Sequence, residues 1–268
     1  FSSNNTSLAG YSSYVQWVIA IFMFLFGVNF NLYFLIIIGK VGEVFKSSEF
    51  WVYFGIVITS IIIVFFNMYE VYGGIAEAVK HSAFQVSSII TTTGFSSMGY
   101  KSLNALTKAV LFTLMFIGGC AGSTAGGFKV SRIIILFKKV VNDVKKVIHP
   151  RTATVVKFEG KKLGDDKIDG VSSYLAIYVL LFILILILIS FDANIIALAS
   201  EQNFNAFEMN FSSALSCYNN IGASLGGLSN WANYTYFSKI VLIFAMLLGR
   251  LEIYPVILLF SVRTWMNK

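Results

Sequence analysis

A threonine-rich turn with one glycine, Thr91-Thr92-Thr93-Gly94-Phe95, lies between two apolar stretches of the chain. Further along, five glycines fall within ten residues in the run Gly118-Gly119-Cys120-Ala121-Gly122-Ser123-Thr124-Ala125-Gly126-Gly127. Glycine permits dihedrals that turn successive carbonyls to one side, and each glycine weakens a helix by about 1 kcal/mol relative to alanine. We therefore expect a non-helical turn at the first site and a break within a helix at the second.

The composition is that of a membrane protein. Hydrophobic residues make up 57% of the chain, charged residues 12%, and the mean hydropathy is +0.76. A soluble domain has roughly a quarter of its residues charged. The charge deficit places the chain in a lipid bilayer, with membrane lipid as its surroundings and no nucleic-acid partner expected. Cys120 and Cys217 lie in apolar stretches and form no disulfide framework.

Five stretches, one of them interrupted by the glycine run, are long and apolar enough to cross a bilayer, which takes about 20 residues in a helix. They are residues 14–38, 50–69, 106–137, 172–191 and 236–260. The shorter segments 75–90 and 205–218 each end at a glycine-containing turn, so we expect them to be re-entrant helices that dip into the membrane and return.

Basic residues occur in three places that share one side of the membrane if the spans alternate. Lys40 and Lys46 lie in 39–49, many lysines lie in 129–167, and Arg263 and Lys268 close the chain. Basic loops stay in the cytoplasm, so the re-entrant segments are expected to enter from outside. The segment 138–170 is either a plain solvated connector or a docking surface for a regulatory partner.

The turn at Gly94 suits an alkali cation. A dehydrated ion needs several oxygens in place of its water, and pores supply them as rings of backbone carbonyls. The order span, short helix, turn, span recurs, and aligning Gly94 with Gly222 also aligns Ser88 with Ser216. The short helices would present their negative ends to the turns. The expected ion-binding residues are Thr92, Thr93, Gly94, Asn220, Ile221 and Gly222.

These motifs together resemble the pore-forming subunit of the Trk/Ktr/HKT superfamily of potassium transporters, and most closely its TrkH type. The resemblance rests on the turn and the glycine run quoted above, with Phe128-Lys129 after the run, and on Asn219-Asn220-Ile221-Gly222, Gly249-Arg250-Leu251-Glu252 and Gly27-Val28-Asn29-Phe30. In the last turn Ala223-Ser224-Leu225-Gly226 departs from the common Pro-Gly-Leu-Gly continuation.

The resemblance implies an all-α transmembrane fold, in which repeated span–pore helix–filter loop–span units surround a pseudo-four-fold pore. We expect this chain to be a C-terminal part of such a protein. Its divisions would be 1–49, the tail of the second repeat; 50–138, the third repeat; 139–170, a cytoplasmic linker; and 171–268, the fourth repeat.

The resemblance also implies potassium as the transported ion at the filter residues, with no covalently bound cofactor and no enzyme activity. The protein would be a multi-pass homodimer in the bacterial cytoplasmic (inner) membrane, with a cytoplasmic nucleotide-binding regulatory subunit of the TrkA type. The glycine run would be an intramembrane gate formed by Gly118, Gly119, Gly122, Gly126, Gly127 and Arg250.

Arg250 lies inside the last predicted span, where a charge is costly unless carbonyls, a carboxylate or water solvate it. We predict that Arg250 donates hydrogen bonds to carbonyls of residues 118–127 and stabilises a closed form of the loop. The alternative is that its side chain reaches the cytoplasmic face.

Other functions fit less of the sequence. The stretch from Gly122 to Lys129 nearly matches a phosphate-binding loop, but Phe128 stands at the lysine position and membrane spans flank it. The glycine run also suits close contact between helices. A Na⁺- or H⁺-coupled cation symporter, a Na⁺-permeable member of the same superfamily and a purely structural membrane subunit stay open as alternatives.

Overall fold

The computed structural model describes residues 7–100, 103–149, 155–202, 205–228, 230–251, 253–260 and 265. Arg263, Lys268 and Glu252, which entered the sequence argument, lie outside these residues. The elements are α1 (Ser13–Phe26), α2 (Phe30–Ile37), α3 (Val41–Phe45), α4 (Ser48–Tyr72), α5 (Ile75–Ile90), α6 (Ala105–Ile117), α7 (Val130–Ile148), β1 (Lys157–Phe158), β2 (Lys161–Lys162), α8 (Asp165–Ser190), α9 (Ala193–Gln202), α10 (Ala206–Tyr218), the 3₁₀ helix η2 (Trp231–Asn233), α11 (Tyr236–Leu251) and α12 (Ile253–Phe260).

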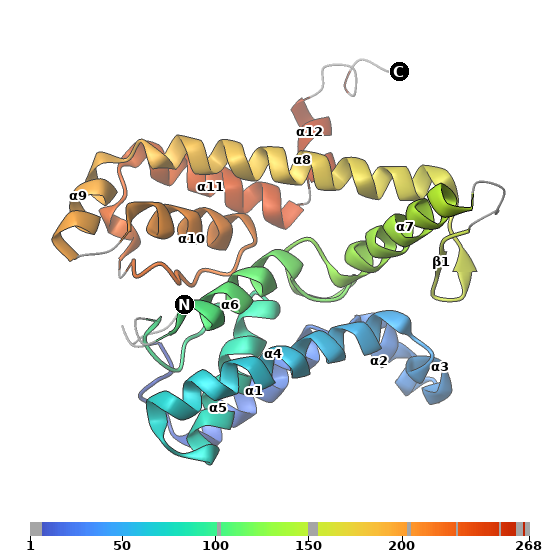
Figure 1. Ribbon diagram of the computed structural model, residues 1–268, viewed down its shortest axis with the longest axis horizontal. Coiled ribbons are helices and arrows are strands. Elements are labelled where there is room, and N and C mark those ends of the chain that lie inside the picture. Colours follow the sequence, from blue (N-terminus) through green and yellow to red (C-terminus); the bar gives the residue numbers. More distant parts are fainter. Residues whose placement is uncertain are drawn as a thin grey trace.

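The helices form two groups. Helices α1, α2, α4 and α5 lie together in one, α8, α9, α10 and α11 in the other, and α6 and α7 run between them (Figure 1). In each group a short helix, α5 or α10, packs beside a long one, α4 or α8. This arrangement confirms the predicted all-α fold with two short pore-type helices.

Two described helices, α4 and α8, are long and apolar enough to cross a membrane. The bent pair of α1 and α2 would make a third span, and α6 is a shorter apolar helix. Large apolar side chains remain exposed along the spans, as at Phe66, Leu180 and Phe244. Such side chains are stable against lipid tails, which are as apolar as leucine.

The stretch predicted as a span over 14–38 is a bent pair of helices rather than one continuous helix. The chain bends by 91° between α1 and α2. A Cβ on Gly27 would overlap the hydroxyl of Tyr53, and the Gly27 carbonyl accepts a 3.0 Å hydrogen bond from the Cys120 amide. The Asn29 side chain then caps the start of α2. The helix breaks here because its backbone pairs with the glycine run.

The predicted break in 106–137 is confirmed, since α6 ends at Ile117 and α7 begins at Val130. The described parts of 138–170 contain regular structure, because α7 continues to Ile148, the β1–β2 hairpin covers 157–162, and α8 begins at Asp165. The expected boundaries after 138 and 170 therefore fall inside helices. The last predicted span is divided as well, with α12 leaving the line of α11 (Figure 1).

The lysine-bearing segments lie at one end of the molecule. The Glu159 carboxylate accepts a 3.0 Å hydrogen bond from the Ser48 hydroxyl, which joins the hairpin to the start of α4. The Tyr254 hydroxyl donates to the Gly170 carbonyl at 3.3 Å, which joins α12 to the start of α8. The membrane orientation expected from the basic residues stays a prediction.

Aromatic packing joins the second group to α6. The rings of Phe116 and Phe182 lie 5.3 Å apart, those of Phe182 and Phe211 5.5 Å, and those of Tyr178 and Tyr218 4.8 Å. Edge-to-face aromatic pairs each add about 0.5–1.5 kcal/mol beyond their buried area. They fix α10, and hence the turn that follows it, against α6 and α8.

Candidate ion-filter site

The turn after α5 has a specific backbone conformation. Thr92 has a φ of +53° and Gly94 a φ of +78°. The Thr92 amide donates to the Ile89 carbonyl at 3.1 Å, and the Thr93 amide donates to the Ser88 carbonyl at 2.9 Å. Thr92, just after the end of α5, thus has a left-handed conformation. The two hydrogen bonds satisfy two of the last carbonyls of the helix.

The turn after α10 has the same conformation. Asn220 has a φ of +57° and Gly222 a φ of +88°. The Asn220 amide donates to the Cys217 carbonyl at 3.1 Å, and the Ile221 amide donates to the Ser216 carbonyl at 2.9 Å. Each of these positions corresponds to one in the first turn when Gly94 is aligned with Gly222. The internal repeat predicted from few identical residues is thus present in the backbone.

The two turns meet. A Cβ on Gly94 would overlap the carbonyl oxygen of Ile221 and would lie 3.4 Å from the Ala223 amide nitrogen. Only hydrogen fits at this place, and a φ of +78° is also strained for residues with a Cβ. The structure thus brings the predicted residues of both turns together, around backbone carbonyls rather than side chains.

Side chains around the turns are engaged in holding them. The Tyr178 hydroxyl donates to Asn219 Oδ1 at 2.6 Å, and Asn220 Nδ2 donates to the Met246 carbonyl at 3.0 Å. The hydroxyls of Thr91 and Thr93 lie 2.9 Å apart. These contacts engage Asn219, the Asn220 side-chain amide nitrogen and two threonine hydroxyls in holding the turns. Backbone carbonyls are oxygens of the kind with which pores bind a cation.

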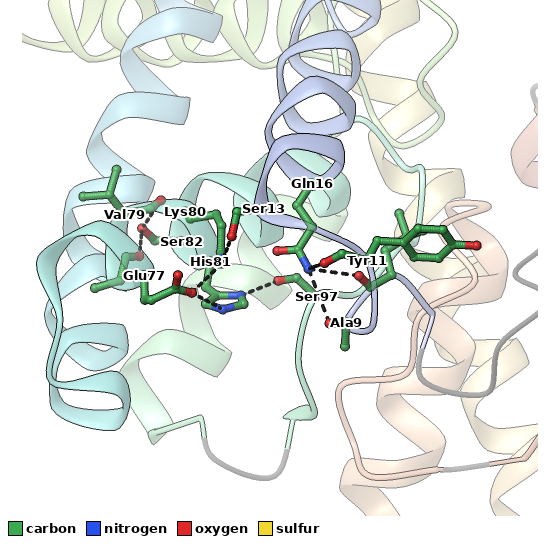
Figure 2. Close-up of polar contacts among 12 residues, drawn as sticks. Ala9, Tyr11, Ser13, Gln16, Glu77, Val79, Lys80, His81, Ser82 and Ser97 are labelled. Atoms are coloured by element: carbon green, nitrogen blue, oxygen red, sulfur yellow. Dashed lines mark hydrogen bonds and ion pairs between the residues drawn. The ribbon is translucent and has the colours of Figure 1, made fainter.

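The segment that leaves the first turn is fixed by a polar network around α1 and α5 (Figure 2). His81 Nδ1 lies 2.8 Å from the Ser97 hydroxyl, and the His81 ring stacks on Tyr72 with centroids 4.4 Å apart. Gln16 Nε2 donates to the Leu8 carbonyl at 3.0 Å. The first bond holds Ser97, just beyond the turn, against α5. The last holds the segment at Leu8, which precedes α1, against α1.

The glycine run is an excursion from an otherwise continuous path. The Phe128 amide donates to the Phe116 carbonyl at 3.1 Å, and the Lys129 amide donates to the Ile117 carbonyl at 2.8 Å. The chain therefore leaves α6 and returns to almost the same place. We call residues 118–127 the glycine loop. Gly118, Gly122 and Gly127 within it have positive φ values.

The glycine loop lies against both turns. The Gly126 amide donates to Thr92 Oγ1 at 2.8 Å. A Cβ on Gly126 would lie 2.5 Å from the Asn219 carbonyl oxygen, so the loop approaches the second turn more closely than a side chain allows. The loop also packs tightly within itself, since a Cβ on Gly119 would lie 2.7 Å from the Ala125 Cβ.

Arg250 contacts the glycine loop as predicted. Its Nη1 donates to the Thr124 carbonyl at 3.0 Å, which confirms the expected hydrogen bond. Arg250 and residues 220–222 also line one cavity of about 780 Å³ along α11. The loop is held from the opposite side by the Phe30 amide, which donates to the Gly122 carbonyl at 3.1 Å.

Sequence reasoning missed Glu49. This residue is buried in the first turn of α4, with 4% of its surface exposed, and Oε1 accepts a 2.7 Å hydrogen bond from the Ala121 amide. Its other oxygen, Oε2, lies 3.5 Å from Asn29 Nδ2. An acidic residue in the first turn of a helix is normally explained by the helix dipole, so the sequence carries no separate signal for this contact.

The helices and paired turns are those of a membrane protein with a repeated unit of long helix, short helix, turn and helix. Comparison with known proteins specifies which kind. The model of the TrkH family, described as a cation transport protein, matches residues 44–266. The chain belongs to the TrkH family.

The chain is similar to several potassium uptake proteins. It is 31% identical over 270 residues to the Trk system potassium uptake protein TrkH of Escherichia coli K12, covering 99% of this chain and 54% of that protein. It is 32% identical over 276 residues to the Trk system potassium uptake protein TrkG of the same organism, covering 99% and 53%. The chain thus spans about half the length of these relatives.

A solved structure has the same fold. The crystal structure of the potassium transporter TrkH from Vibrio parahaemolyticus superimposes with a TM-score of 0.83 at 28% sequence identity. The match covers 99% of this chain and 56% of that one. The resemblance seen in the motifs is thereby confirmed for the family and the fold.

Proposed function

We propose that this chain takes part in potassium uptake across the bacterial cytoplasmic membrane, with the carbonyls of residues 92–94 and 220–222 replacing the water around the ion. The observation that carries the proposal is the pair of turns with one backbone conformation, which meet at Gly94 and Ile221. Rings of carbonyls are the means by which pores bind dehydrated K⁺. Proteins similar to the chain are named potassium uptake proteins.

The electrostatics favour a cation at the turns. Both turns follow the C-terminal ends of helices, α5 and α10, where unpaired carbonyls carry a partial negative charge. Non-helical backbone at membrane depth is stable only where it lines a cavity or is buried in protein. The second turn meets that condition, because residues 220–222 line the cavity along α11.

The glycine loop is proposed as the gate beneath this filter, formed by Gly118, Gly119, Gly122, Gly126, Gly127 and Arg250. The hydrogen bonds from Gly126 to Thr92 and from Arg250 to Thr124 hold the loop against the turns. Opening the pathway would break these bonds. Five glycines keep the loop from forming a stiff helix that would resist the movement.

The assembly is proposed from the same family membership. The chain would supply the tail of a second repeat (1–49), a third (50–138) and a fourth (171–268) around one pore, joined by the linker 139–170. It would act as a homodimer with a nucleotide-binding regulatory subunit of the TrkA type. The lysine-bearing end, where the hairpin meets α4, would face the cytoplasm and that subunit.

Rubidium uptake by cells that express the full-length protein, and lack other potassium uptake systems, tests the proposal. We expect saturable uptake that K⁺ inhibits and Na⁺ does not. Gly94→Ser and Gly222→Ser should both reduce uptake to background, because both positions have a positive φ and lie in the turns.

Gly99→Ser is the matched control, since Gly99 follows the same turn and a Cβ there meets no atom within 4 Å. Its uptake should equal that of the wild type. Uptake that requires a Na⁺ or proton gradient would favour a coupled symporter, and equal inhibition by Na⁺ a Na⁺-permeable pathway. Uptake that survives both turn substitutions would reject the filter.

A further inference from the structure

The β1–β2 hairpin contacts the start of α4, and the start of α4 contacts the glycine loop. We propose that Glu159 at the hairpin tip and Glu49 in the first turn of α4 form a two-step latch, in which Glu159 is a positioning residue for gating. This inference rests on the proposed role of residues 118–127 as the gate. It adds the hairpin to the proposed gate. The contacts that form the latch can be tested without measuring ion transport.

The hairpin tip is strained in a way that needs an external contact. Phe158 pairs with Lys161, which leaves Glu159 and Gly160 as a two-residue turn. Both have a positive φ, +47° and +73°. Such turns favour asparagine, aspartate or glycine at the first position, and glutamate there is held against its backbone preference. A residue in this conformation persists when surrounding contacts over-determine it.

Within the described part of the chain, the Glu159 carboxylate contacts the start of α4. Glu159 Oε1 accepts hydrogen bonds from the Ser47 hydroxyl at 3.2 Å, the Ser48 hydroxyl at 3.0 Å and the Glu49 amide at 3.0 Å. The first amides of a helix lack partners within the helix, and a negative charge beside them is favourable. Glu159 is thus a cap for α4 supplied by a segment more than a hundred residues away.

Glu49 continues the connection to the gate. Its amide bonds Glu159, and its own carboxylate accepts the Ala121 amide at 2.7 Å. The bond to Ala121 lies inside the glycine loop, one residue from Gly122, whose carbonyl is held by the Phe30 amide. One buried residue, Glu49, therefore contacts both the hairpin and the loop, and a shift of the first turn of α4 moves the Glu49 carboxylate with it.

The hairpin is short and exposed, so we expect it to move more easily than the helices. Lys157, Lys161 and Lys162 are exposed on its two strands, and each strand is only two residues long. A short surface hairpin opens at lower free energy than buried helices do. When Glu159 leaves α4, the Glu49 amide loses its partner and the glycine loop loses the support that keeps it against the turns.

The test uses Glu159→Ala and Glu49→Ala, singly and together, in the full-length protein. The first readout is the rate at which a methanethiosulfonate reagent modifies Cys120, which is fully buried in the glycine loop. A background in which alanine replaces Cys217 and any cysteine outside this chain leaves Cys120 as the one reactive thiol. The second readout is rubidium flux. Glu43→Ala is the control, since Glu43 is an exposed glutamate on the preceding helix that pairs with Lys46.

We expect Glu159→Ala to raise both Cys120 modification and flux roughly fivefold, as for coupling residues remote from a site. The double variant should equal Glu49→Ala alone, because both act through one connection, and Glu43→Ala should match the wild type. Unchanged Cys120 reactivity in Glu159→Ala, or multiplying effects in the double variant, would overturn the latch. Faster Cys120 modification in a protein whose wild type carries no rubidium would support the latch and reject the proposed function.

Discussion

At the scale of single residues, the charge of Arg250 is stabilised by a hydrogen bond to the glycine loop. The guanidinium donates to the Thr124 carbonyl at 3.0 Å while the rest of the side chain stays exposed to the cavity along α11. A hydrogen bond from a charged group contributes about 1.5–3 kcal/mol when buried, and less when exposed. We therefore assign it about 1 kcal/mol in favour of the loop conformation in this structure, which under the proposed gating role is roughly a fivefold change in the open population.

Arg250→Ala should raise rubidium flux by about that factor, and Arg250→Lys should raise it less because an ammonium can still reach a carbonyl. Lys239→Ala is the matched control, since Lys239 lies on the same helix and lines the same cavity but donates to the Ala232 carbonyl instead. Stopped-flow flux into proteoliposomes measures both. Equal flux in Arg250→Ala and wild type would remove Arg250 from the gate.

At the scale of elements, local signals predicted most of the helices. The turns, the glycine run and the two short helices all follow from glycine placement and from the length of apolar segments. The bend at Gly27 could not be predicted from local sequence, because the residues that cause it, Tyr53 and Cys120, are distant from it in the chain. Glu49 and Glu159 were missed for the same reason, since a cap donated by a remote hairpin leaves no local pattern.

Gly27→Ala tests the bend. The added methyl would overlap the Tyr53 hydroxyl and contact Thr91, so the free energy of unfolding should fall by about 1–3 kcal/mol, as for overpacked cores. Gly55→Ala provides the comparison, because a Cβ at that helical glycine meets nothing within 4 Å and alanine favours helices by about 1 kcal/mol. Thermal unfolding of the purified protein should show opposite shifts. Equal melting temperatures would contradict the packing at Gly27.

At the scale of the whole molecule, the chain is organised as two units that differ in sequence and agree in backbone. The order of elements predicted this repeat better than the few matching residues did. The hairpin and α9 lie at opposite ends of the molecule, as Figure 1 shows for β1 and α9, and we predict that these ends face opposite sides of the membrane. The exposed Lys161 and Glu201 mark the two ends.

Cysteine labelling from outside the cell tests this orientation. In a background without Cys120 and Cys217, an impermeant maleimide should label Glu201→Cys in intact cells and should label Lys161→Cys only after the membrane is opened. The reason is that lysine-rich segments remain in the cytoplasm. Labelling of Lys161→Cys in intact cells would invert the arrangement.

The central claim is that backbone carbonyls of the two turns bind the transported ion. The most direct measurement is anomalous diffraction from crystals of the full-length protein grown in rubidium. We predict rubidium density between the turns, within about 3 Å of carbonyl oxygens of residues 92–94 and 220–222, as carbonyl rings bind K⁺. Rubidium density confined to other parts of the protein, with none between Gly94 and Gly222, would contradict the account.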